Sequence, residues 1–511
     1  MTIAENSLVC RLFITLWAAL SDAWAVSAVG RFFRAAGRGI RSAVEQSVLC
    51  RFLWRDGAIP AGWPESVTCK VLTFLLNLPC LICKGIYKVG RGVLDGSLVF
   101  RAVSALGGAT FLLTGLFLAV MLVAPHDNWN NLYAFIGALF LFVLFALGSA
   151  ARSTHRIEVV EAGPYLTLFM GFVCYALLSS LNTHAGLRFF AFHLTGFLLV
   201  LLVVSSVKKY EQLQLLVVLA VAGMTVAALY GCYQGVTGVE VVANQQDMTL
   251  NAGMPGRVYA FFDNPNNFAE LLVMLMPLDV ALFFNARTWR GKLASVFSFG
   301  VCAASLGFTL SRSCWLGIAL AALVFLAFVN WKLIPVLVVA GLCCIPLLPT
   351  TIYNRILTIG NMKDTSTSYR FAIYGASGTL MKDYWLRGVG LGSDVLKETF
   401  KAYPTMFDGN YPIHTHNNYL QVWAEMGLGG ILTFLATLLY QLKAGVKAFL
   451  SCGDKRVKYL LAAAVAGFCG ILLISVAEYT WYYPRNMFIY WTLFGVIAAC
   501  VKLARQSVKK A

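Results

Sequence analysis

Residues 414–427 read HTHNNYLQVWAEMG and mark the point at which a long polar segment ends and a long apolar helix begins. The apolar run over 418–442 is long enough to cross the roughly 30 Å hydrocarbon core of a membrane as a helix. Within it, Asn418, Gln421 and Glu425 are three and four residues apart and therefore share one helix face. A polar stripe at this depth is expected to face the interior of a helical bundle.

The composition of the whole chain predicts an all-α, polytopic integral membrane protein. Of its 511 residues, 59% are hydrophobic and only 12% are charged, and the mean hydropathy is +0.73. Soluble domains contain about 25% charged residues. Apolar runs of about 18–25 residues indicate about twelve transmembrane helices. The predicted spans lie near 103–124, 131–150, 163–182, 186–206, 212–234, 266–286, 293–310, 313–330, 333–349, 418–442, 458–478 and 486–504.

The distribution of Lys and Arg predicts the orientation of these spans. Basic residues are dense in the N-terminal region, in alternate loops and in the C-terminal tail, so both termini are predicted to be cytoplasmic. The longest external segment is 350–417, and long segments translocate whatever their charge. The net charge of +17 lies largely in cytoplasmic flanks, where anionic membrane lipids rather than nucleic acid are the expected partners.

Four regions follow from this organisation. Residues 1–100 form a cytoplasmic, basic, amphipathic extension, 101–349 contain transmembrane helices 1–9, 350–417 form a large external loop with the catalytic motif, and 418–511 contain helices 10–12 and a cytoplasmic tail. In the extension, basic residues recur at helical spacing on a common face. They are Arg31, Arg34, Arg38 and Arg41. The extension is either a basic segment that lies on the membrane surface or a partner-binding module.

Three arginines on the predicted external side are candidates for binding an anion. Arg257 precedes Asn264-Pro265, a good N-cap and first-turn pair, and a helix N-terminus there suits a phosphate. The alternative is simple capping, with Arg257 reaching to water. Arg312 lies in a tight turn, where a lone arginine can also anchor lipid headgroups. Arg370 lies within 350–417. The glycines at 388–392 are expected to make turns rather than a phosphate loop.

Two histidines precede the tenth helix at its positive end. An imidazole of His414 or His416 is suited to act as a general base toward a hydroxyl. The His-x-His spacing also invites a metal ion, but Glu425 is about two helical turns away and no Cys is near, so we expect no metal. An unspecific polar rim is the remaining alternative.

These elements together resemble the O-antigen ligase and polymerase superfamily of bacterial membrane glycosyltransferases. The resemblance covers roughly residues 100–505, and its motifs lie in Arg257–Glu270, Ser311–Gly317, Arg370, Gly388–Gly392 and His416–Gly427. It implies a GT-C-like helical enzyme with no cofactor and no metal. Such an enzyme passes a glycan from undecaprenyl diphosphate to a hydroxyl of a lipid or cell-wall glycan acceptor on the external face of the bacterial cytoplasmic (inner) membrane.

The resemblance also implies roles for individual residues. Arg257, Arg312 and Arg370 would stabilise the diphosphate leaving group. His416 would activate the acceptor hydroxyl or position the acceptor, with inversion at the anomeric carbon. His414 would share or orient that proton transfer. Glu425 is a third catalytic candidate, and the supporting residues are Asn264, Asn266, Asn417 and Asn418.

Three functions fit the sequence to different degrees. A ligase and a polymerase share every motif above, and the single long loop late in the chain favours the ligase. A transporter of lipid-linked glycans is disfavoured, because transporters commonly show repeats and broken helices with charge at the membrane midplane.

Overall fold

The computed structural model describes residues 8–47, 51, 54–55, 57–242, 254–360, 365–403 and 411–508. Within these ranges all regular secondary structure is helical, which confirms the predicted all-α fold of a polytopic membrane protein. The chain divides into two compact units, Met1–Gly62 and Trp63–Ala511. The unit boundary therefore lies well before residue 100, the predicted end of the extension.

The first unit contains α2 (Leu8–Val26), α3 (Ala28–Gln46) and α5 (Ala58–Gly62). Helix α3 begins after Ser27, whose side chain accepts a hydrogen bond from the backbone N–H of Gly30 at 2.8 Å. All four arginines of the predicted amphipathic pattern lie within α3.

The second unit contains the remaining helices. They are α6 (Val67–Leu94), α7 (Leu98–Gly108), α8 (Thr110–Val123), α9 (Leu132–Gly148), α10 (Val159–Ala162), α11 (Pro164–Leu178), α12 (Thr183–Ser206), α13 (Tyr210–Thr237), α14 (Pro265–Asn285), α15 (Trp289–Phe308), α16 (Arg312–Asn330), α17 (Ile334–Cys344), α18 (Thr350–Leu357), α19 (Thr365–Tyr384), α20 (Ser393–Phe400), α21 (Asn418–Ser451), α22 (Lys455–Ile474) and α23 (Pro484–Val508). Short 3-10 helices are η1 (Trp63–Glu65), η2 (His126–Asn128), η4 (Trp331–Leu333) and η5 (Ile345–Leu347).

The structure does not confirm the predicted number of twelve spans. Nine helices in the described part of the chain are long and apolar enough to cross a membrane, or ten if the pair α7 and α8, bent by 70°, forms one span. The predicted spans 131–150 and 163–182 correspond to α9 with 17 residues and α11 with 15, because polar caps at Ser149 and Ser179 end these helices early. Helix α6 adds a candidate span that the sequence did not predict.

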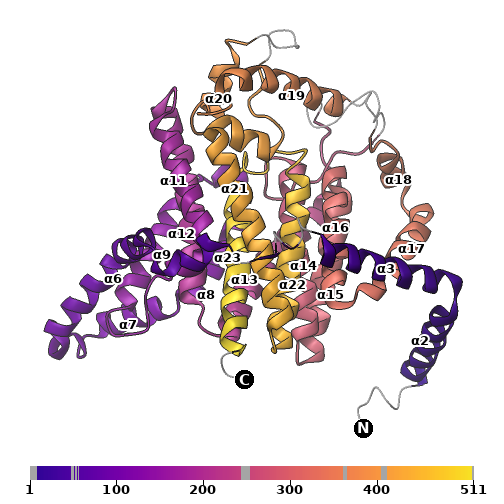
Figure 1. The fold of residues 1–511 in the computed structure, drawn as a ribbon, viewed down its shortest axis with the longest axis horizontal. Coiled ribbons are helices and arrows are strands. Elements are labelled where there is room, and N and C mark those ends of the chain that lie inside the picture. Colours follow the sequence, from indigo (N-terminus) through magenta and orange to yellow (C-terminus); the bar gives the residue numbers. More distant parts are fainter. Residues whose placement is uncertain are drawn as a thin grey trace. The chain divides into compact units, whose positions relative to one another are not determined.

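The core of the second unit is centred on α23, whose residues from Pro484 to Ala504 are all buried. This helix packs against α12, α21 and α22, and α22 packs against α14 and α16. Figure 1 shows α21, α22 and α23 side by side. Glycines allow the closest approaches, since a Cβ at Gly467 would lie 2.4 Å from the Met274 carbonyl oxygen. The arrangement is that of a polytopic helical bundle.

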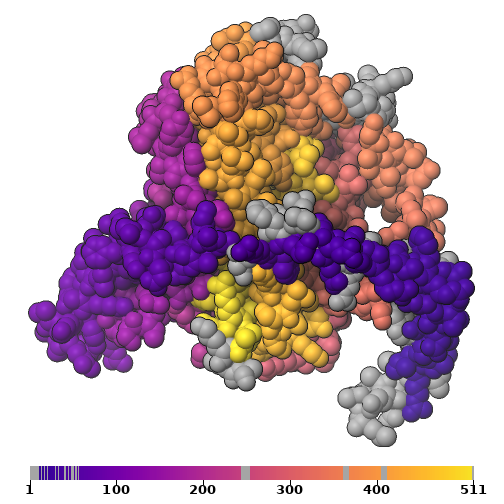
Figure 2. Space-filling view, in the orientation of Figure 1, coloured from indigo at the N-terminus to yellow at the C-terminus, as the bar shows by residue number. Residues whose placement is uncertain are grey.

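The region 350–417, predicted as one large loop, contains α18, α19 and α20. Helices α19 and α20 lie at one end of α21 in Figure 1, and their orange atoms cover that end in Figure 2. Gly388, Gly390 and Gly392 all have positive φ angles, which confirms that these glycines make turns.

This glycine turn packs into a break in α21. Gly427 has a φ of 67°, so the helix is interrupted there, and the freed carbonyl oxygens become available to other donors. The backbone N–H of Val389 donates to the Ala424 oxygen at 2.8 Å, and that of Gly390 donates to the Glu425 oxygen at 3.1 Å. These bonds hold the region after α19 on the first turns of α21.

Candidate active site

The predicted site residues gather at the end of the bundle where α14, α16 and α21 begin. Asn264 caps α14 by accepting from the backbone N–H of Asn266 at 2.8 Å, and Asn417 caps α21 by accepting from that of Leu420 at 2.9 Å. Helix N-termini carry free N–H groups and a partial positive charge. The N-termini of α14, α16 and α21 therefore favour the binding of an anion at this end of the bundle.

Glu478 connects the predicted residues to one another. Its Oε1 accepts a hydrogen bond from Arg370, with which it forms an ion pair, and a second from the Asn266 amide at 3.4 Å. Its Oε2 lies 3.5 Å from Nδ1 of His416. One buried carboxylate thus joins α14, α19, the segment before α21 and the loop after α22.

The charge of this carboxylate is strongly stabilised. Burial alone would raise the pKa of Glu478, but the opposite charge of Arg370, together with His416 and His414, lowers it to about 2. Glu478 is therefore ionised at neutral pH. The sequence did not single it out because it lay at the end of the predicted span 458–478, whereas α22 ends at Ile474.

Arg257 is joined to Glu478 through Asn266. Its Nη2 donates to Oδ1 of Asn266 at 2.5 Å, and its Nε donates to the Thr309 carbonyl oxygen at 2.8 Å. The side chain is buried, with only 7% of the residue exposed. Burial and the nearby charge of Arg355 lower the pKa of Arg257 to about 9, so the guanidinium remains charged at neutral pH.

Arg312 and Arg355 complete a group of cations around Arg257. Arg312 donates to the carbonyl oxygen of Thr358 at 3.0 Å and to its hydroxyl at 2.9 Å, and Arg355 donates to the Leu310 carbonyl oxygen at 3.4 Å. The positive charges of both arginines help to lower the pKa of Arg257. Arg355 lies on α18 and was not among the predicted residues, because an arginine inside an assumed loop carries no positional signal.

The two histidines lie in contact but in different environments. Their ring centroids are 4.2 Å apart, and the ring of His414 also packs 4.4 Å from that of Tyr482. Nδ1 of His414 accepts from the backbone N–H of His416 at 3.3 Å, so its proton belongs on Nε2. Burial and the neighbouring His416 lower the pKa of His414 to about 3. His414 is therefore neutral at physiological pH.

His416 is the imidazole that faces a carboxylate. Because Glu478 lies beside Nδ1, the favoured neutral tautomer carries its proton there and leaves the Nε2 lone pair available as a base. His416 has a φ of 48°, an unusual backbone conformation for a residue with a side chain. The Tyr374 hydroxyl donates to the His416 carbonyl oxygen at 3.1 Å and helps to hold that conformation.

The polar stripe of α21 lies behind the histidines rather than beside them. Asn418, Gln421 and Glu425 are all buried, as the stripe predicts. Gln421 donates to Glu425 at 2.7 Å and accepts from the backbone N–H of Thr415 at 2.9 Å. Glu425 thereby supports the segment that carries both histidines, and within the described residues it hydrogen-bonds to neither histidine ring. Both side-chain polar atoms of Asn418 lack a partner among the described residues.

The described residues contain no group of three or more His, Cys, Asp and Glu side chains that could hold a metal ion. Metal independence nevertheless stays a prediction, which requires a direct test with a chelator.

Residues 297–435 match the family model described as O-antigen ligase. The matched segment contains Arg312, Arg370 and both histidines, whereas Arg257 and Glu478 lie outside it. No curated protein matches the chain. The family match confirms the predicted resemblance to the O-antigen ligase and polymerase superfamily.

Proposed function

Because residues 297–435 match the O-antigen ligase family model, we propose that this chain transfers a glycan from undecaprenyl diphosphate to an acceptor hydroxyl. The reaction would take place on the external face of the bacterial cytoplasmic membrane, without a metal ion and with inversion at the anomeric carbon. The acceptor would be a lipid or cell-wall glycan, as for an O-antigen ligase.

The observation that carries this proposal is the set of contacts around Glu478. Glu478 contacts both the proposed base, His416, and Arg370, and it is joined to Arg257 through Asn266. A glycosyl transfer from a lipid diphosphate needs a base for the acceptor and cations for the leaving group on opposite sides of one sugar carbon. The contacts around Glu478 support the proposal because they bring a candidate base and candidate cations into one cluster.

The proposed chemistry is a single displacement. The acceptor oxygen bonds to the anomeric carbon as the bond from that carbon to the phosphate oxygen breaks, and the acceptor proton passes to Nε2 of His416. Glu478 stabilises the imidazolium that forms. General base catalysis of this kind contributes about 10²–10⁴-fold in rate. The leaving diphosphate gains negative charge, which the grouped guanidiniums would stabilise by charge-assisted hydrogen bonds.

A partly exposed aromatic surface next to the histidines supports a sugar acceptor. The ring of Tyr482 lies 4.4 Å from that of His414 at a tilt of 44°, and Tyr482 is 41% exposed. Asp263 and Asp394 are close enough to act on it electrostatically. A ring with an apolar face and neighbouring carboxylates suits the mixed apolar and hydroxyl surface of a sugar.

The deciding experiment is transfer by the purified protein in detergent with EDTA, from undecaprenyl-diphosphate glycan to a panel of acceptors. We expect product with wild type and with Glu398→Gln, a control that removes an exposed carboxylate of α20, and none with His416→Ala or Arg312→Ala. Thermal melts must show that the variants are folded. Activity that survives in both site variants would contradict the assignment of the site.

The same panel separates the proposed ligase from the alternatives. Product on a second lipid-linked unit, and on no other acceptor, would make the protein a polymerase. If no acceptor yields product while proteoliposomes move the lipid-linked glycan across the bilayer, the protein is a transporter.

A further inference from the structure

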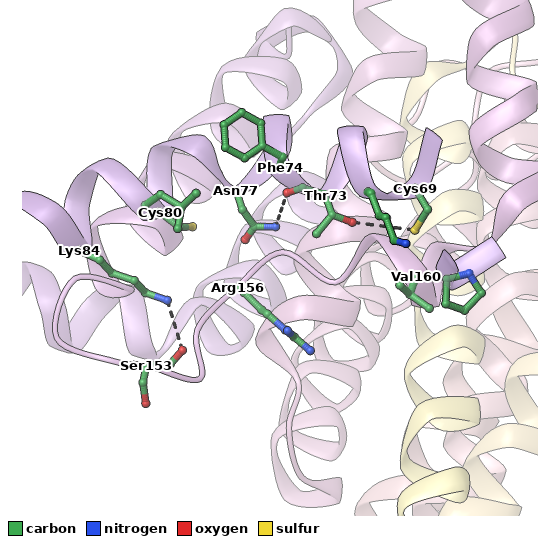
Figure 3. A pocket seen from close by; sticks show the side chains of 12 residues that line it. Cys69, Thr73, Phe74, Asn77, Cys80, Lys84, Ser153, Arg156 and Val160 are labelled. Carbon is green, nitrogen blue, oxygen red and sulfur yellow. Dashed lines mark hydrogen bonds between the residues drawn. The ribbon is translucent and has the colours of Figure 1, made fainter. Parts of the chain in front are cut away.

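A pocket of about 460 Å³ lies between α6 and the segment 153–160, far along the chain from the candidate active site. Figure 3 shows its lining side chains. Phe74, Leu81 and Val160 contribute apolar surface. Three cations also line the pocket, and they are Lys70, Lys84 and Arg156. No catalytic or supporting residue of the proposed transferase takes part in it.

Helix α6 is bound tightly to one loop of the bundle. Asn77 donates to the Ile157 carbonyl oxygen at 3.0 Å and accepts from the Ile157 N–H at 2.7 Å. One side-chain amide thus satisfies both backbone groups of a buried residue. Lys84 donates to the carbonyl oxygens of Ser153 at 3.2 Å and His155 at 2.9 Å. Hydrogen bonds therefore hold together the two segments that form the pocket.

Helix α6 is long and apolar enough to cross a membrane, but its direction favours a position along a membrane surface. In Figures 1 and 3 this helix runs across the direction of α23 rather than along it. The loop that holds it contains Arg152 and Arg156, which the charge pattern predicts to be cytoplasmic. An amphipathic helix in that position lies between the headgroups and the acyl chains.

The outer face of α6 exposes apolar side chains that we expect a membrane or a partner to cover. Val67, Val89 and Val93 are 77%, 92% and 80% exposed, and apolar side chains of Phe74, Leu75 and Ile82 are also exposed. A patch of this kind marks contact with a membrane or a partner. The adjacent cations favour an anionic membrane as that cover.

The pocket cations have hydrogen-bond donors available. Lys84 uses two N–H groups for the loop carbonyls, and an ammonium has three. Arg156 has no hydrogen bond or ion pair within the described ranges, and its side chain is exposed. Lys70 is paired with Glu65 at 3.0 Å and is therefore partly neutralised. Lys84 and Arg156 are the stronger candidates for a phosphate.

We propose that this pocket binds an anionic phospholipid of the adjacent leaflet, with the phosphate against Lys84 and Arg156 and the first acyl carbons against Phe74 and Leu81. The apolar lining beside the cations distinguishes such a lipid from a free phosphate, which would leave that surface uncovered. The proposal is independent of the transferase activity.

The test uses the full chain in detergent with two photoreactive phospholipids of equal chain length, an anionic phosphatidylglycerol and a zwitterionic phosphatidylcholine. Cross-linked peptides are mapped by mass spectrometry, and affinity is read from the shift in melting temperature as lipid is added. Arg156→Gln is the main variant because Arg156 makes no hydrogen bond or ion pair with the described part of the chain that its loss would break. Lys88→Gln removes an equal charge from an exposed position of α6 outside the pocket.

We expect phosphatidylglycerol to label peptides within 67–94 and 153–160, and phosphatidylcholine to label them much less. Arg156→Gln should weaken the response to phosphatidylglycerol about fivefold, which corresponds to about 1 kcal/mol for one basic residue near a membrane surface. Lys88→Gln should respond as wild type does. Labelling elsewhere, equal losses in both variants, or full protection by inorganic phosphate alone would overturn the proposal.

Discussion

Replacing Glu478 by Gln tests the proposed base most directly, because the change keeps the size of the side chain and removes its charge. The Oε2 atom lies 3.5 Å from Nδ1 of His416. At an effective dielectric constant of about 20, a full imidazolium and a carboxylate at that distance attract by about 5 kcal/mol. Arg370 pairs with the same carboxylate, and the proton is only partly transferred in the transition state. We therefore expect a loss of about 2 kcal/mol, or about 30-fold in kcat.

The assay is transfer from undecaprenyl-diphosphate glycan under saturating donor and acceptor, with wild type, Glu478→Gln and Glu398→Gln compared. The control variant removes a carboxylate that pairs with Lys401 on the surface of α20, so it should keep the wild-type rate. Circular dichroism and melting temperature separate a catalytic loss from misfolding. A folded Glu478→Gln protein with more than half of the wild-type kcat would refute the role assigned to this carboxylate.

Three further predictions concern other residues of the site and its support. His414→Gln should flatten the dependence of melting temperature on pH. Burial lowers the pKa of His414 in the folded protein to about 3, below the ordinary value of about 6.5. The contribution of the neutral ring to wild-type stability is therefore complete above about pH 6.5 and is lost as the pH falls toward 3. Melts between those values check this, and an unchanged slope would count against a buried neutral ring. Gly427→Ala should destabilise the fold by about 2–4 kcal/mol, since its φ is 67° and the new Cβ would lie 2.1 Å from the Leu386 oxygen; a wild-type denaturation midpoint would contradict this. Glu425→Gln should reduce kcat less than Glu478→Gln does, because Glu425 contacts Gln421 rather than a histidine ring, and an equal or larger loss would restore its predicted catalytic role.

Much of the site could be predicted because its residues lie at the starts of helices. Asn264 and Asn417 stand where a polar segment turns into an apolar run, and the structure has both as N-caps. Glu478 and Arg355 were missed for opposite reasons. Glu478 lay at the end of an apolar run and was counted with it, whereas Arg355 lay in a region without periodicity. Helix ends are the least certain part of any pattern, since capping shifts them by a few residues.

The number of spans shows the same limit. The hydropathy pattern predicted full spans at 131–150 and 163–182. It contains no information on where a C-terminal cap, Ser149 in α9 and Ser179 in α11, ends a helix. The sequence placed α6 in the amphipathic extension rather than among the spans, because polar positions such as Asn77 and Lys84 interrupt its apolar run. The structure explains these polar positions, because Asn77 and Lys84 hydrogen-bond to the backbone of Ile157 and His155.

The sequence by itself predicted a helical membrane protein that resembles the O-antigen ligase and polymerase superfamily, with polar residues at helix starts. Periodicity and hydropathy are local properties, and they are enough to specify which segments are helices and which faces are buried. Only the tertiary structure decided that Glu478 joins His416, Arg370 and Asn266, and that Glu425 stands behind them. Such contacts join residues up to 212 positions apart, and their geometry depends on how whole helices pack, which no local pattern encodes.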